Sequence, residues 1–160
     1  VTQQLTADGK MQTVSGTGEV VLEAIKLCNP DGQSLEVVGV GQPVVLHIQA
    51  RCNKAVDSLV AGYMIKDRLG QSIFGTNTYH HQQVLTGLVA GTEVEYRFAF
   101  PANLGPGTYR LAAAFHADDS HLSANYQWRD PALVFSVVNI NQPEFVGVAW
   151  ITPDIEVSIR

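Results

Sequence analysis

Charged residues are scarce in this sequence: Asp, Glu, Lys and Arg make up only 16% of its 160 residues. The formal net charge is −5, and no cluster of Lys and Arg occurs. Proteins that bind nucleic acid or acidic membranes display a basic patch or stripe. The composition therefore makes nucleic acid and acidic membrane surfaces poor candidate partners.

Cysteine and long apolar runs are also in short supply. Cys28 and Cys52 could pair, but two thiols in a domain with an adequate core are more often reduced and buried. No apolar run approaches the roughly 18 residues of a membrane helix, and no signal peptide is present. Because the chain begins at Val1 without Met, we expect a fragment of a longer protein.

What the sequence does contain is a series of short apolar runs separated by Gly, Pro, Asn and Asp. Hydrophobic residues reach 46%, and a chain of this length buries roughly 70% of its unfolded surface as one domain. Strands spaced about 8–12 residues apart predict an all-β sandwich or barrel. The expected strands are 19–27, 34–38, 43–52, 59–67, 71–77, 92–100, 108–116, 132–140 and 145–151.

Alternation within these runs supports antiparallel strands with one buried face. In 44–51 one face is apolar (Val44, Leu46, Ile48, Ala50) and the other is mostly polar (Val45, His47, Gln49, Arg51). The segment "LGPGTYRL" leads from a Gly-rich corner into Tyr109, whose hydroxyl can bond back to the corner, as in immunoglobulin-like sandwiches. An ordinary core tyrosine is the alternative.

The two ends of the chain fit the sandwich less well. Residues 1–15 are polar and lack periodicity, which predicts a linker or arm, and 16–140 hold the sandwich. Beyond them, 141–160 contain Pro143 in a short hinge and an extra apolar strand. That strand either adds to an edge of its own sheet or exchanges into a second copy as a dimer.

Motifs for catalysis or metal binding are missing. His80 and His81 are adjacent, so on a strand they face opposite sides and cannot easily share one ion. There is no Gly-x-Ser-x-Gly elbow and no GxxxxGK[ST] phosphate loop. The adjacent acids Asp118 and Asp119 are the best acidic pair, but they are more typical of a solvated turn, and calcium there is a weak alternative. We expect no catalytic residues, no metal and no cofactor.

A set of aromatic and hydrogen-bonding side chains remains. Sugars present apolar C–H faces ringed by hydroxyls; aromatic rings cover the faces, while amides, His and Arg meet the hydroxyls. The strand 108–116 adds small outward residues, Ala112 and Ala114, which leave room for a groove. For any one ring, structural packing is an equally good interpretation. The candidate carbohydrate-binding residues are Tyr63, Asn77, Tyr79, His80, Tyr126, Trp128 and Arg129.

Several of these blocks also resemble a known family. The sequence between 16 and 138 is similar to the C-terminal domain of Wzt, the nucleotide-binding subunit of the ABC transporter that exports O-antigen polysaccharide. The blocks that carry the resemblance are "GTGEVVLEAIKLCNPDGQ", "VVGVGQPVVLHIQA", "GYMIKDRLGQSIFGTNT", "LVAGTEVEYRFAF" and "LGPGTYRLAAAF".

The resemblance implies an immunoglobulin-like β-sandwich that follows an ATPase domain. It implies binding of the lipopolysaccharide O chain at its modified terminal end, with a likeness to polymannose-type systems, and selection of this cargo for export. It also implies a homodimer at the cytoplasmic face of the bacterial inner membrane, partnered by the membrane-spanning transporter subunit. The alternatives are an interaction or dimerisation module without glycan binding, and a small glycan-active enzyme using Asp118 and Asp119.

Overall fold

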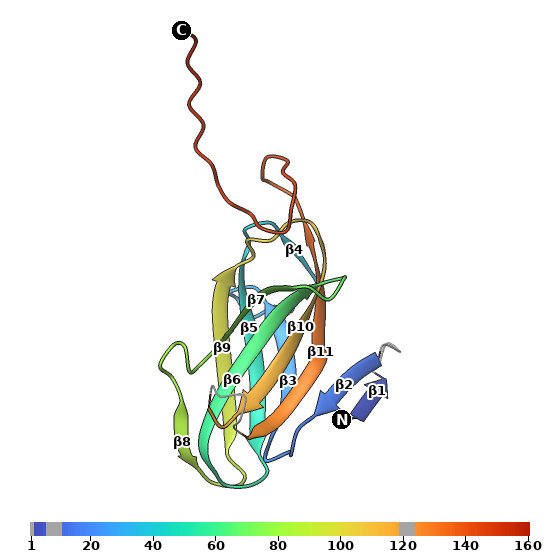
Figure 1. The fold of residues 1–160 in the computed structure, drawn as a ribbon, viewed down its shortest axis with the longest axis vertical. Helices are drawn as coiled ribbons and strands as arrows, with labels where there is room; N and C mark the ends of the chain where they lie inside the picture. The colour runs from blue at the N-terminus through green and yellow to red at the C-terminus, as the bar shows by residue number, and fades with distance from the viewer. Residues whose placement is uncertain (1, 6–10, 119–123) are drawn as a thin grey trace.

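The computed structural model describes residues 2–5, 11–118 and 124–160, and every regular element within them is a β-strand (Figure 1). The strands, in chain order, are β1 (Thr2–Leu5), β2 (Met11–Ser15), β3 (Val20–Cys28), β4 (Val37–Gly39), β5 (Pro43–Cys52), β6 (Val56–Asp67), β7 (Ser72–Asn77), β8 (Leu85–Leu88), β9 (Glu93–Pro101), β10 (Gly107–His116) and β11 (Asn125–Val138).

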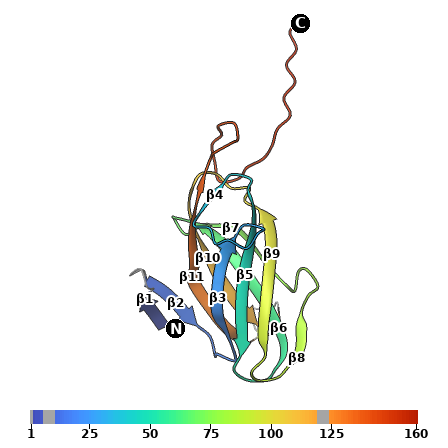
Figure 2. The ribbon, with the colours of Figure 1, turned by 180° about the vertical axis from the view of Figure 1, so that it is seen from behind.

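The strands form two packed sheets, which confirms the all-β sandwich (Figures 1 and 2). The larger sheet, here sheet A, has the order β1-β2-β11-β10-β6-β7. In addition, β4 pairs with β11 and β8 pairs with β6. Sheet B has the order β3-β5-β9. All pairs are antiparallel except β4 with β11.

The alternating apolar residues meet between the sheets, as the period-two pattern predicts. Leu46 and Ile48 of β5 face Leu111 and Phe115 of β10 in one core cluster, and all four are fully buried. Burying each such side chain stabilises the fold by roughly 1.5–3 kcal/mol. Both cysteines lie buried and unpaired in the same sandwich.

The tyrosine corner is confirmed. The hydroxyl of buried Tyr109 donates a hydrogen bond of 2.7 Å to the carbonyl of Gly105 at the corner before β10. Gly105 in turn donates its amide to the carbonyl of Val148, which ties the C-terminal segment to the same corner. A Cβ on Gly105 would lie 1.8 Å from the carbonyl oxygen of Gly147, so this close approach requires glycine.

Within 1–15, the stretch expected to be a linker or arm, residues 2–5 and 11–15 form strands. β1 and β2 pair with each other, and β2 adds to the edge of sheet A, where Val14 is the partner of Arg129. Residues 125–131 of β11 and all of β8 are likewise strands that the apolar pattern missed. Backbone hydrogen bonds hold a strand in a sheet, so polar residues can form one where a neighbouring edge is free.

At the other end, the strand expected over 145–151 does not form within the chain. The segment makes one isolated bridge, between Ala149 and Leu104, and packs Phe145 against Trp150 with ring centroids 4.7 Å apart. Residues 151–160, here the C-terminal tail, then extend away from the sandwich (Figures 1 and 2) and are exposed throughout. Among the described residues, no strand pairs with 152–160.

Candidate functional site

The two adjacent histidines lie on the loop between β7 and β8, and each contributes to a different cavity. His80 lines a groove on the outer face of sheet A, whereas His81 lines a cleft between the two sheets. The loop is therefore a wall shared by both cavities. Neither a metal site nor a catalytic pair is built from these two side chains.

Hydrogen bonds to β6 fix this loop. Thr78 is buried, and its hydroxyl accepts the amide of Ala61 at 3.0 Å while its own amide donates to the Ala61 carbonyl at 2.9 Å. The side-chain oxygen of Asn77 accepts the amide of His80 at 2.9 Å. Gln82 has a φ of 60°, the left-handed conformation that lets the tight turn close.

Small residues make the floor of the outer groove, which has a volume of about 550 Å³. Gly62 of β6 and Ala114 of β10 are register partners, and Ala112 lies two residues before Ala114 on the same face. A Cβ on Gly62 would come within 2.9 Å of the Asn77 Cβ, so glycine allows β7 to lie close here. The lack of side-chain bulk along two central strands creates the groove.

The walls of the groove are aromatic and polar. Trp128 of β11, the register partner of Ala114, stands on one side, and Asn77 and His80 stand on the other. His116, at the end of β10, and Asn125, at the start of β11, are also among the lining residues. One ring beside amide and imidazole groups matches the chemistry predicted for a sugar site.

Of the predicted carbohydrate-binding residues, the structure brings Asn77, His80 and Trp128 together in this groove, and Tyr63 also contributes to its lining although its ring is buried in the core. Tyr79 lies next to it, half exposed, with its ring 6.0 Å from the His80 ring. Its side chain lines a separate shallow hollow with Gln82.

The structure places Tyr63 and Tyr126 in the core cluster. The Tyr63 ring packs 5.0 Å from Phe98 and 5.8 Å from Phe100 of the opposite sheet. Burial raises its pKa to about 12. The Tyr126 hydroxyl donates to the carbonyl of Ser58. These two rings therefore have a packing role, which was the alternative interpretation for each aromatic candidate.

Arg129 also faces away from the groove. It is the register partner of Ala113, a core residue, so its side chain points to the inner side of sheet A, opposite to Trp128. Its Nε is enclosed without a hydrogen-bond partner, and burial lowers the pKa of the guanidinium. The sequence pattern predicts no strand at 125–131, so the choice of Arg129 rested on its chemistry and not on the direction of its side chain.

The groove also contains residues that were not among the candidates. Met64 and His116 lie on the same outward faces as Gly62 and Ala114, and period-two counting along β6 and β10 identifies them. Asp118 lines the groove too, whereas Asp119 and His121 lie outside the described residues. Asn125 carries no sequence signal, because only the pairing of β10 with β11 brings it here.

The second cavity is a cleft of about 770 Å³ between the edges of the two sheets. β7 ends sheet A and β9 ends sheet B, and both strands line the cleft. Aromatic rings form part of its lining, and Val148 and Ala149 of the C-terminal segment also line it. The rings that contribute are Tyr63, Phe74, Tyr96, Phe98 and Phe100.

Across the described residues, no three His, Cys, Asp or Glu side chains gather as a metal site would require. No helix among them has the length and apolarity to span a membrane. The lining of the outer groove offers the Trp128 ring for stacking and the Asn77 and His80 side chains for hydrogen bonding.

Comparisons with known proteins give the family and the fold. The family described as the Wzt C-terminal domain matches residues 11–151. The crystal structure of the C-terminal domain of Wzt superposes with a TM-score of 0.80 at 17% identity, covering 92% of this chain and 89% of that one. A Niemann-Pick type C2 protein from the Japanese carpenter ant gives a TM-score of 0.53 at 11% identity, covering 79% and 99%. No curated protein matches the chain in sequence.

Proposed function

Because the chain belongs to the family of the Wzt C-terminal domain, we propose that it is a carbohydrate-binding domain that recognises O-antigen polysaccharide. The family relation supports a role in the O-antigen ABC transporter, and the domain is associated with transport and not with catalysis. In the proposal, the domain gives the exporter its cargo specificity by selecting the polysaccharide.

The observation that carries this proposal is the outer groove. Its small floor admits a ring, Trp128 offers a flat apolar face, and Asn77 and His80 supply groups that donate and accept hydrogen bonds. A groove of about 550 Å³ contacts only a few sugar rings at a time. Since a repeating chain has one distinctive end, we propose that the modified terminal end is what binds, as in a polymannose-type O chain.

The remaining partners follow from the same proposal. In the full-length protein an ATPase domain precedes this one and contacts the membrane-spanning transporter subunit. The protein then lies at the cytoplasmic face of the bacterial inner membrane. Two such subunits serve one transporter, so the domain is a homodimer.

The C-terminal tail supports the dimer. Ile151, Ile155, Val157 and Ile159 are each at least 78% exposed, and the last three alternate with polar residues as in a half-buried strand. The aromatic cleft has two strand edges that pair with no further described strand, and it accepts such a segment by main-chain hydrogen bonds. We propose that the tail of a second copy occupies it.

Retention of the domain on immobilised O-antigen polysaccharide tests the glycan proposal. The expected result is retention on the matched serotype, none on a mismatched one, and loss of retention in Trp128→Ala with the unfolding midpoint unchanged. Tyr79→Ala, in the adjacent hollow, shows whether the site extends past the groove. Normal retention of Trp128→Ala would place the glycan elsewhere, and release of shorter chains during incubation would favour an enzyme instead.

Sedimentation tests the dimer separately. Deleting residues 152–160 should convert a dimer into a monomer, because the exchanged segment is lost. If the full chain is already a monomer, the exchange is refuted. A dimer that retains no polysaccharide would favour the alternative, an interaction module whose aromatic residues serve protein contacts.

A further inference from the structure

Beside the groove, a lysine lies over the ring that the proposed function uses. The Lys66 ammonium is 5.4 Å from the centroid of the Trp128 ring. Lys66 lies on β6 two residues after Met64, so both side chains are on the outer face of sheet A. An ammonium at this distance attracts the ring electrostatically, and the lysine stem adds apolar contact.

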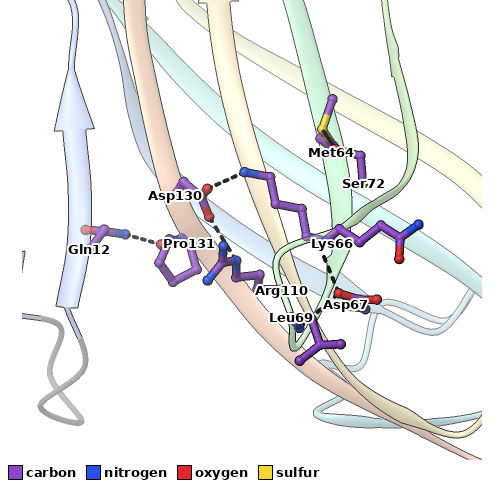
Figure 3. A network of polar contacts seen from close by, with 10 residues as sticks. Gln12, Met64, Lys66, Asp67, Leu69, Ser72, Arg110, Asp130 and Pro131 are labelled. Carbon is purple, nitrogen blue, oxygen red and sulfur yellow. Dashed lines mark hydrogen bonds and ion pairs between the residues drawn. The ribbon is translucent and has the colours of Figure 1, made fainter.

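An aspartate fixes this lysine. One carboxylate oxygen of Asp130 is 2.7 Å from the Lys66 Nζ, and the two side chains are only 13% and 16% exposed. The other carboxylate oxygen is 3.6 Å from the Nε of Arg110, the register partner of Lys66. Figure 3 shows Lys66 and Arg110 converging on Asp130 from two neighbouring strands.

The order along β11 explains how the three groups act together. Asp130 follows Trp128 by two residues, so ring and carboxylate project from the same face of one strand. The carboxylate pulls the lysine across β10 towards β11, and the ammonium then comes to lie over the ring. A free surface lysine would instead keep its ammonium in water and sample many rotamers.

From this arrangement we infer that Lys66, held by Asp130, is a positioning residue for Trp128 in glycan binding. The inference rests on the proposed function. The Lys66 ammonium is engaged by Asp130 and by the ring, so its role is to limit the orientations of Trp128. A ring already held in its binding orientation loses less conformational freedom when a sugar stacks on it.

The test uses Trp150→Phe as the background, because Trp128 is then the only tryptophan. In that background, Lys66→Met should increase acrylamide quenching of Trp128 and shift its emission maximum. It should also weaken binding of the O-antigen polysaccharide about 2- to 12-fold, the range expected when one side chain must be immobilised on binding. Lys66→Arg should restore both, and Asp130→Asn should resemble Lys66→Met.

The matched control is Lys26→Met, which removes an exposed lysine from the outer face of sheet B. The inference is overturned if Lys66→Met leaves quenching and affinity as in the control, or if Lys66→Arg fails to restore them. Trp128→Ala separates the proposed glycan site from the proposed role of Lys66. If Trp128→Ala binds the polysaccharide normally, the glycan site in this groove is refuted. Quenching in Lys66→Met still decides the contact between lysine and ring, because that readout needs no glycan.

Discussion

Filling the groove floor should weaken glycan binding strongly while leaving the fold intact. Ala114 lies between Gly62 and Trp128 in the strand register, and its own side chain is only 4% exposed. Directly opposed Cβ atoms in antiparallel strands are about 4.5–5.5 Å apart. The longer side chain of Ala114→Leu would therefore reach the space beside the Trp128 ring, where the sugar is proposed to stack.

The size of the loss follows from the area of the ring. A tryptophan side chain buries roughly 150–250 Å², so one face against a sugar removes about 100 Å² from water. At about 25 cal/mol per Å² this face contributes around 2.5 kcal/mol. Losing it should raise Kd about 60-fold. The added carbons enter the open groove and not the core, so the unfolding midpoint should change by less than about 4 °C.

The assay is titration of the O-antigen polysaccharide, followed by calorimetry or tryptophan fluorescence. Thr108→Leu is the matched control, because Thr108 lies on the same face of β10 but outside the groove. Thr108→Leu should bind with wild-type affinity. Equal affinities for Ala114→Leu and Thr108→Leu would show that the groove does not hold the glycan.

Two further predictions concern tyrosines that the structure buries. Tyr109→Phe removes the hydrogen bond to Gly105 and leaves a buried carbonyl unpaired, so the free energy of unfolding in urea should fall by about 1–3 kcal/mol; a change below about 0.5 kcal/mol would contradict this role. Tyr63, whose pKa is raised to about 12, stays protonated in the folded state between pH 10 and 12 while the unfolded phenol ionises. Stability should therefore fall as pH rises through this window, by about 1.4 kcal/mol per pH unit from this residue. Tyr63→Phe should remove this contribution to the pH dependence of stability. Tyr79→Phe, which removes the hydroxyl of a half-exposed ring, should leave the contribution unchanged.

Much of the fold follows from local patterns. The alternation in 43–52 and 92–100 predicts both the strands and their buried faces, because a one-residue change of facing would expose every apolar side chain. The Gly-rich corner before Tyr109 predicts its hydrogen bond for a similar reason, since the spacing between corner and ring is short in sequence. Polar strands such as β2 and the first half of β11 give no such signal, because a neighbouring edge decides whether they pair.

The candidate site was likewise predicted only in part from the sequence. Residue chemistry alone selected Asn77, His80 and Trp128, which do meet in one groove. It equally selected Tyr63 and Arg129, which face the interior. The stretch 125–131 has no clear apolar alternation, so the sequence does not predict which residues of this part of β11 face outward.

By itself, the sequence determined the all-β class, the faces of the central strands, the lack of a basic surface and the family resemblance. These depend on composition and on contacts between residues near one another in the chain. Only the tertiary structure decided that His80 and His81 serve different cavities and that Asp130 holds Lys66 over Trp128. The pairing of β6, β10 and β11 creates those contacts between residues that are more than 60 positions apart, as Lys66 and Asp130 are. Since strand order is set by the packing of the whole sandwich, local patterns cannot contain it.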